Sequence, residues 1–234
     1  MKKVLGFLSL SLLLLSFHHP AADAQSDIDE SIREVVVHNP NARSFIRRGT
    51  AFHVGGGVFY TNAHVVKTVL PEGFTQWYLA SKTSTRAVSS WLGPVTVSCV
   101  HPRWRDSGDR TATPYDIAIL RMAEAPTLPV FSFHDGAPAL GLRVTIKGFP
   151  SASRAWPPIL YTAAGRISQI LWQEHVFRVA VDSGFALGGS SGSPVFAEDG
   201  RVLGVLYAGV GERGAAQEHI SVIFASAAQE GCPR

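Results

Sequence analysis

The chain has 234 residues, with 21 Lys and Arg against 18 Asp and Glu, which gives a formal net charge of +3 at pH 7. This small basic excess forms no stripe and accompanies no nucleic-acid motif, so nucleic-acid binding is not expected. Two cysteines exclude a disulfide framework as the main source of stability. No His/Cys/Asp cluster has metal-ligand spacing, and neither a metal nor another cofactor is expected.

The first 24 residues have the pattern of a secretory signal peptide. Met1-Lys2-Lys3 is a short basic region, residues 4–17 are apolar, and Ala22-Asp23-Ala24 has the form of a cleavage site. An apolar stretch of about 14 residues is short for a membrane span, which needs about 20. We therefore expect an exported protein, periplasmic or extracellular, that starts near Gln25 and has no stable membrane insertion after cleavage.

Residues 25–48 are polar and end in Arg47-Arg48. Two interpretations are open for this segment. It is either a propeptide with a dibasic processing site, or an N-terminal arm or short helix (residues 28–37) that packs on the domain that follows.

From Gly49 onward, short β-favouring runs are broken by Gly, Pro, Asn and Asp. Strands and helices do not alternate, which favours an all-β barrel or sandwich. Short helices are expected only at residues 64–69 and 225–230, and the Pro-containing residues 125–129 are the best linker. The expected strands are 50–54, 58–61, 76–80, 95–100, 117–121, 143–147, 161–170, 175–181, 195–196, 202–207 and 220–224.

A run of small residues, 188–194, surrounds Ser191. Such a run lets the backbone turn sharply and lets a substrate carbonyl approach closely. It also leaves backbone N–H groups to point at one spot, as an oxyanion hole requires. Ser191 is the candidate nucleophile, and the N–H groups of Gly189 and Ser191 are the candidate oxyanion donors. A plain Gly/Ser loop is the alternative.

Two upstream residues favour the catalytic interpretation. His64 follows the strand-like residues 57–60, and Asp116 precedes the apolar residues 117–120. A serine hydroxyl needs a base to remove its proton, and the imidazole needs a carboxylate to hold its tautomer. The chain order His, Asp, Ser differs from the order found in subtilisin and in α/β-hydrolases.

The blocks TNAHVV (61–66), DIAIL (116–120) and GSSGSPVF (189–196) resemble the three signature blocks of trypsin-like serine peptidases with the chymotrypsin fold. Bacterial glutamyl endopeptidases and HtrA-type proteases are the most similar branch, and the resemblance covers roughly residues 48–226. It implies two six-stranded antiparallel β-barrels with the active site in the cleft between them. The first barrel, residues 49–126, would carry His64 and Asp116; the second, residues 130–234, would carry Ser191.

In this family the primary substrate pocket is walled by the residues before the serine block and by the strand after it. Glutamyl endopeptidases place a histidine in the later strand, and Leu206 stands at the matching place here. No matching residue is charged, so a small or apolar P1 residue is expected. These residues are Phe185, Ala186, Leu187, Leu206, Tyr207, Ala208 and Gly209.

Export permits a disulfide between Cys99 and Cys232. The alternative is that Cys99 is a free, small buried residue. We therefore predict an exported, monomeric serine endopeptidase that cleaves polypeptides through an acyl-enzyme intermediate. Two alternatives use the same sequence features. One is a non-catalytic binding or adhesion module on a protease fold; the other is an esterase with the same triad.

Overall fold

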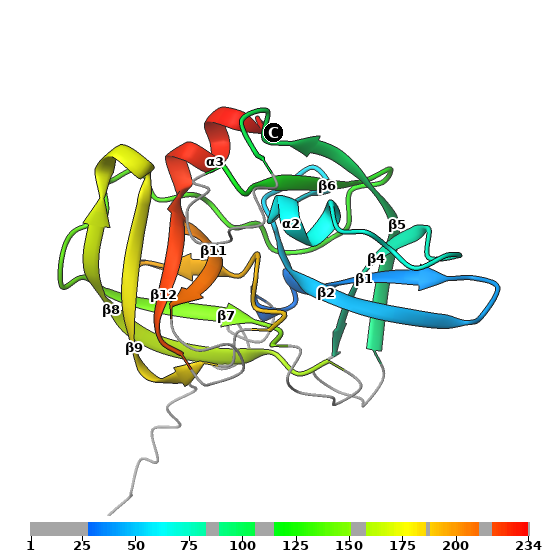
Figure 1. The fold of residues 1–234 in the computed structure, drawn as a ribbon, viewed down its shortest axis with the longest axis horizontal. Helices are drawn as coiled ribbons and strands as arrows, with labels where there is room; N and C mark the ends of the chain where they lie inside the picture. Colours follow the sequence, from blue (N-terminus) through cyan, green and yellow to red (C-terminus); the bar gives the residue numbers. More distant parts are fainter. Residues whose placement is uncertain are drawn as a thin grey trace, which may run out of the picture.

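The computed structural model describes residues 28–82, 89–105, 115–150, 158–185, 188–210 and 217–233. Within them, the chain forms two closed six-stranded antiparallel barrels that lie side by side (Figure 1). The all-β prediction with two six-stranded barrels is thus confirmed. The predicted signal peptide, residues 1–24, lies outside the described residues. Among the described helices, none combines the length and apolar character needed to cross a membrane.

The first barrel has the strand order β1-β2-β3-β6-β5-β4. One short helix, α2 (Ala63–Val66), follows β3 and carries His64. The strands are β1 (Ile32–Asn39), β2 (Ser44–His53), β3 (Val58–Thr61), β4 (Gln76–Lys82), β5 (Ser89–Val100) and β6 (Ala118–Met122).

The helix expected over residues 28–37 is wrong for most of this range, because the segment belongs to the first barrel. Residues 32–39 form β1, and residues 44–48 are the first half of β2, so neither a helix nor a separate arm is present there. β1 pairs with β2 on one side and with β4 on the other, which closes the barrel. The dibasic pair Arg47-Arg48 lies within β2, and cleavage after it would open the barrel.

The second barrel has the strand order β10-β11-β12-β9-β8-β7. A 3₁₀ turn, η1 (Trp172–Glu174), joins β8 to β9, and the C-terminal helix α3 (Ala225–Gly231) follows the last strand. The strands are β7 (Arg143–Gly148), β8 (Tyr161–Leu171), β9 (Val176–Phe185), β10 (Pro194–Phe196), β11 (Val202–Val210) and β12 (Gln217–Phe224).

β3 shows how the first barrel is packed, because all four of its residues are buried. Successive side chains of a strand point to opposite faces. Phe59 therefore fills the barrel interior with Leu79 and Leu120, whereas Val58 and Tyr60 belong to the cluster that continues into the second barrel. A strand that is apolar on both faces lies between two hydrophobic layers, and here the outer layer is the contact between the barrels.

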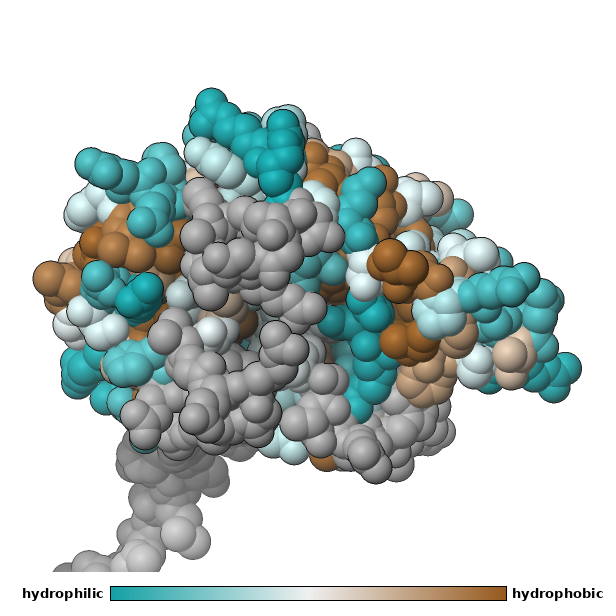
Figure 2. Space-filling model, viewed as in Figure 1, coloured by the Kyte–Doolittle hydropathy of each residue, from teal (hydrophilic) through white to brown (hydrophobic). Residues whose placement is uncertain are grey.

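Aromatic rings fill that contact. Phe52 and Tyr60 from the first barrel meet Phe131 and Phe133, which lie in the segment that connects the barrels. The Tyr60 and Phe133 ring centroids are 5.2 Å apart in an edge-to-face arrangement. On the face shown in Figure 2, hydrophilic and hydrophobic residues are interspersed over both barrels.

Polar and covalent bonds also join the first barrel to the connecting segment and to the C-terminal end of the chain. The Ser31 hydroxyl donates to the Pro129 carbonyl at 2.6 Å. The Tyr60 hydroxyl donates to the Cys232 carbonyl, also at 2.6 Å. Cys99 on β5 and Cys232 after α3 form a disulfide, so the structure resolves the pairing that the sequence left open.

Candidate active site

Asp116 is held at the end of the first barrel by three hydrogen bonds. Its backbone carbonyl accepts from Nδ2 of Asn62 at 2.7 Å. One carboxylate oxygen, Oδ1, accepts from the backbone N–H of His64 at 2.8 Å, and the other, Oδ2, bonds Nδ1 of the His64 ring. The carboxylate is only 5 % exposed, while the His64 side chain is 29 % exposed. A buried carboxylate thus holds a ring that faces solvent.

This contact fixes which nitrogen of His64 carries the proton. An ionised carboxylate can only accept hydrogen bonds, so Nδ1 must be the donor to Asp116. Nε2 is then left with its lone pair on the accessible side of the ring. A neutral imidazole in this tautomer has the arrangement that a general base requires.

Ser191 lies in a tight turn of the second barrel, formed by residues 188–193 and called the serine turn below. The N–H of Ser193 donates to the Ser190 carbonyl at 3.0 Å, and the N–H of Gly192 donates to the Leu206 carbonyl at 2.8 Å. Gly192 has a φ of +88°, and a Cβ there would overlap the Thr50 carbonyl. Position 192 therefore needs glycine for both its backbone conformation and its space.

The two backbone groups expected to act as oxyanion donors lie in this turn. Among the described residues, neither the N–H of Gly189 nor the N–H of Ser191 donates a hydrogen bond. Backbone N–H groups left unpaired at one loop are suited to stabilise a negative oxygen. Gly189 is half-buried and has a φ of +89°, a region that glycine enters without steric cost.

Gly49 shows that the serine turn and the helix of His64 meet. A Cβ on Gly49 would lie 2.7 Å from Cγ2 of Val65, the neighbour of His64, and 2.9 Å from the Ser191 carbonyl oxygen. The structure therefore places Ser191 beside α2. No hydrogen bond between the Ser191 hydroxyl and His64 is present among the described residues, as is common before substrate binds.

The predicted pocket wall is described in part. The backbone of Leu206 bonds the serine turn directly, since its N–H donates to the Ser193 carbonyl at 2.9 Å. Leu206 and Tyr207 are buried, Ala208 is half-buried and Gly209 is exposed. Burial raises the pKa of the Tyr207 hydroxyl above its usual range, while a bond to Ser221 opposes the shift. Residues 186–187 lie outside the described part of the chain, as does the side chain at position 185.

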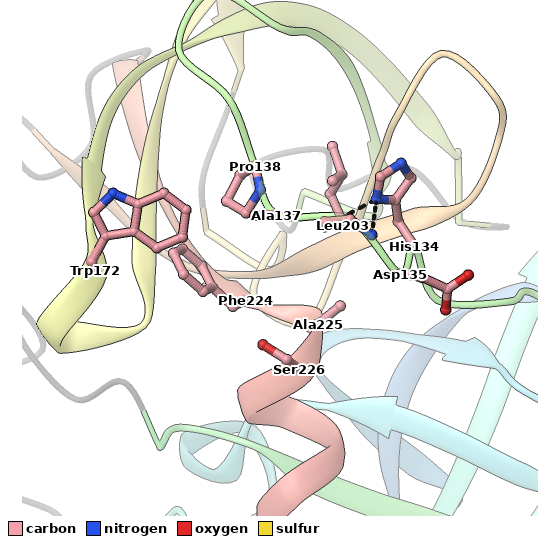
Figure 3. A pocket seen from close by; sticks show the side chains of 10 residues that line it. His134, Asp135, Ala137, Pro138, Trp172, Leu203, Phe224, Ala225 and Ser226 are labelled. Carbon is pink, nitrogen blue, oxygen red and sulfur yellow. Dashed lines mark hydrogen bonds between the residues drawn. The ribbon is translucent and has the colours of Figure 1, made fainter.

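Two hollows lie elsewhere, and none of the candidate catalytic residues lines either one. Figure 3 shows the first, about 200 Å³ in volume, with Trp172, Pro138 and Phe224 around it. The second, about 720 Å³, is lined by residues 28–29, the connecting segment 129–132 and the turn between β10 and β11, among others. Neither hollow adjoins the serine turn, so neither is the expected substrate pocket.

Two residues of the site had no assigned role in the sequence interpretation. Asn62 donates to the Asp116 carbonyl, and Thr50 bonds both Ser191 and Gly189. Asn62 lies within the block TNAHVV and Thr50 within an expected strand, but neither pattern reveals which partner a polar side chain contacts. Burial of a polar residue is the signal that marks them in the structure, since both are fully buried.

Two closed six-stranded antiparallel barrels define the chymotrypsin fold. The family model of the trypsin-like peptidase domain matches residues 49–205, which is more than half of the chain. The chain therefore belongs to the trypsin-like peptidase family and is a serine endopeptidase by class. No curated protein sequence matches the chain significantly.

Solved structures share the fold at low sequence identity. The active form of the Rv3671c protease from M. tuberculosis is 19% identical, with a TM-score of 0.57 over 98% of this chain and 92% of that one. Neuropsin from mouse brain is 15% identical, with a TM-score of 0.62 over 84% and 91%. The HtrA-type protease AlgW is 17% identical, with a TM-score of 0.60 over 89% and 65%.

Proposed function

We propose that the chain is an exported serine endopeptidase that cleaves peptide bonds through His64, Asp116 and Ser191. The observation that carries this proposal is the buried Asp116 carboxylate that orients His64 beside the turn of Ser191. The apolar residues 4–17 and the cleavage-site pattern after them support export. A polypeptide is the substrate, and the enzyme acts as a monomer.

The chemistry follows from the roles of these groups. Nε2 of His64 takes the proton of the Ser191 hydroxyl as Oγ attacks the peptide carbonyl, and the N–H groups of Gly189 and Ser191 bind the resulting oxyanion. The C–N bond then breaks, and His64 gives its proton to the leaving amine. Water, deprotonated by the same imidazole, attacks the acyl-enzyme; the ester bond to Oγ breaks, His64 returns the proton to Oγ, and the acid leaves.

The proposed P1 preference is for small or apolar residues. Leu206, whose backbone bonds the serine turn, is a buried aliphatic residue, and Tyr207 beside it is buried and neutral at pH 7. Nothing in this part of the wall pairs with a charged P1 side chain. Profiling with a peptide library tests the preference: dominant cleavage after Lys, Arg or Glu would contradict it.

The nucleophile is tested by labelling with a fluorophosphonate probe at neutral pH. The parent is expected to be labelled and Ser191→Ala is not, because the probe reacts only with a serine activated by its base and oxyanion donors. Ser193→Ala is the matched control, since it removes a neighbouring buried hydroxyl from the same turn and is expected to be labelled.

Other outcomes are equally informative. Labelling of both the parent and Ser191→Ala would mean that another serine is the nucleophile. Absence of labelling in folded parent protein would favour the non-catalytic binding module. Labelled parent protein that hydrolyses small acyl esters but no peptide in the library would favour the esterase.

A further inference from the structure

Asn62 stands where the helix of His64 begins, but its side chain does not cap that helix. It is the N-cap residue of α2, its backbone is extended, and its side chain makes no capping bond within the described part of the chain. An asparagine at this position ordinarily accepts a hydrogen bond from the N–H of the second or third helical residue. The second helical residue of α2 is His64, and its N–H donates to Oδ1 of Asp116 instead. A residue 52 positions after His64 therefore supplies the cap.

The side chain of Asn62 makes the reciprocal contact. Its Nδ2 donates to the backbone carbonyl of Asp116 at 2.7 Å. A carbonyl can only accept, so the NH₂ group must face it and Oδ1 is turned away from it. Among the described residues Oδ1 has no hydrogen-bond partner, although Asn62 is fully buried. An unpaired buried oxygen costs stability, so the bond of Nδ2 is what this side chain contributes.

The two contacts hold Asp116 on α2 through both its main chain and its side chain. The carbonyl carbon and Cβ of Asp116 are both bonded to its Cα. A carbonyl held by Asn62 therefore fixes the point from which the carboxylate reaches His64. From that point, Oδ1 meets the N–H of His64 and Oδ2 meets Nδ1 of its ring.

The same contact keeps Asn62 from competing with Asp116. Without a partner for Nδ2, the amide is free to rotate into the ordinary capping position, where its Oδ1 accepts from the N–H of His64. The Asp116 carboxylate then loses one of the two donors that align it with the imidazole. The bond from Asn62 to the Asp116 carbonyl thus prevents this exchange of caps.

We propose that Asn62 is a positioning residue that keeps the Asp116 carboxylate aligned with Nδ1 of His64. The inference rests on the proposed function, since it needs His64 as the base and Asp116 as the group that holds it. Asn62 is fully buried and acts through Asp116, not on the substrate. Loss of its bond lets Asp116 shift relative to α2, so that the imidazole spends part of the time without its orienting carboxylate.

The kinetic test uses Asn62→Asp and Asn62→Leu, both close to asparagine in size. An aspartate here caps the N–H of His64 itself and, when ionised, cannot donate to the Asp116 carbonyl. A carboxylate that no longer holds the imidazole in its tautomer costs about 10⁴-fold in kcat, so partial misalignment in Asn62→Asp is expected to lower kcat roughly 10- to 100-fold. Asn62→Leu removes the donor without a competing cap, and a smaller loss of about 3- to 10-fold is expected. KM is expected to change less than about threefold in both variants, because Asn62 does not bind the substrate.

Tyr60→Phe is the matched control that separates positioning from folding. It also removes one buried donor to a backbone carbonyl, here the bond from the Tyr60 hydroxyl to Cys232 at 2.6 Å. Tyr60→Phe is expected to lower Tm as the Asn62 variants do, and to leave kcat unchanged. Equal kcat losses in Tyr60→Phe and Asn62→Asp would show a general structural effect and overturn the proposal, as would an unchanged kcat in folded Asn62→Asp.

The ring nitrogens of isotope-labelled histidine give a second readout that a merely structural role does not move. Their NMR shifts report which nitrogen of the neutral His64 ring carries the proton. The parent and Tyr60→Phe are expected to hold the proton on Nδ1, and both Asn62 variants to show a mixture of the two tautomers. Should Asn62→Asp fail to fold, Asn62→Leu carries both measurements. An unchanged tautomer in the folded Asn62 variants would overturn the role of Asn62. Failure of the parent to react with the fluorophosphonate probe would instead overturn the proposed function.

Discussion

Glu34 is a carboxyl group buried in the β-strand pair that also holds Thr50. It lies opposite Thr50 in the β1–β2 register and bonds Nε of Arg47 on the same strand as Thr50. Its side chain is 1% exposed. Burial raises the pKa of Glu34 to about 7, although the hydrogen bond and the charge of Arg47 oppose the shift. The carboxyl is therefore easier to protonate in the folded chain than in the unfolded chain.

This shift makes a prediction about stability and pH. Below about pH 4.5 the group is protonated in both states, and above about pH 7 it is ionised in both. Between these values the folded state keeps a proton that the unfolded state has lost, so the contribution of Glu34 to stability falls as pH rises. The expected slope is roughly 1 kcal/mol per pH unit.

The measurement compares the parent with Glu34→Gln, which keeps the shape and removes the titration. Denaturant unfolding at a series of pH values gives the difference in free energy of unfolding between the two proteins. That difference is expected to shift in favour of Glu34→Gln from about pH 4.5 to 7 and to level off above. A difference that stays constant across this interval would contradict the raised pKa.

At the residue scale, the sequence indicated candidate residues but few of their contacts. His64 and Asp116 were recognised by short blocks, and the structure places their side chains in hydrogen-bond contact. The bond from Thr50 to Gly189 joins residues 139 positions apart, and no local pattern encodes such a pair. The same holds for Glu34, whose charge favours a surface position unless its partner Arg47 is known.

At the scale of elements, β1 and β2 are the clearest difference from the sequence interpretation. Arg33 and Glu34 interrupt the apolar run of β1, so its pattern is not the alternation expected of a strand. In the structure both side chains are buried and bonded: Arg33 to the Ser81 hydroxyl, Glu34 to Arg47. Later strands such as β6 and β11 were predicted because their apolar runs have no buried charges.

The position of β1 predicts the effect of cleavage after Arg48. A chain that begins at Gly49 lacks β1 and the first half of β2, and β1 bonds both neighbours that close the barrel. Val35, Val36 and Val37 are fully buried, so their loss removes part of the core. We expect the fragment 49–234 to be unfolded, with no near-UV circular dichroism and no fluorophosphonate labelling.

A chain that begins at Gln25 is the control, because it retains every described strand. It is expected to fold and to be labelled like the parent. If the fragment 49–234 were instead folded and labelled, residues 25–48 would be dispensable, and the propeptide interpretation would be supported.

At the scale of the whole molecule, the two barrels share one hydrophobic cluster. Phe52 and Tyr60 of the first barrel belong to the same buried cluster as Val195 and Val205 of the second. The strand pattern predicted an all-β barrel or sandwich, and the resemblance implied two six-stranded barrels. Their fusion was not predictable, because it depends on aromatic rings, hydroxyl bonds and a disulfide whose partners are far apart in the chain. The Cys99–Cys232 disulfide alone spans a separation of 133 residues.

A shared cluster of this kind predicts that the barrels unfold together. Exposing the face of the first barrel that carries Tyr60 would also expose Phe133, so neither half keeps its core when the other unfolds. Scanning calorimetry of the parent is expected to show one transition with equal calorimetric and van't Hoff enthalpies. Cys99→Ser with Cys232→Ser removes the covalent link, which typically costs about 2–5 kcal/mol, and is expected to lower Tm by roughly 10 °C.

The double variant is also the sharper test of cooperativity. If the hydrophobic cluster holds the barrels together, the variant still unfolds in one transition, only at lower temperature. Two transitions in the variant would mean that the disulfide alone couples the halves. Two transitions in the parent would mean that the barrels unfold independently.

The site depends on this coupling, because His64 and Asp116 come from one barrel and Ser191 from the other, and Thr50 bonds across the boundary. Conditions that separate the barrels should therefore abolish labelling at the same temperature as the calorimetric transition.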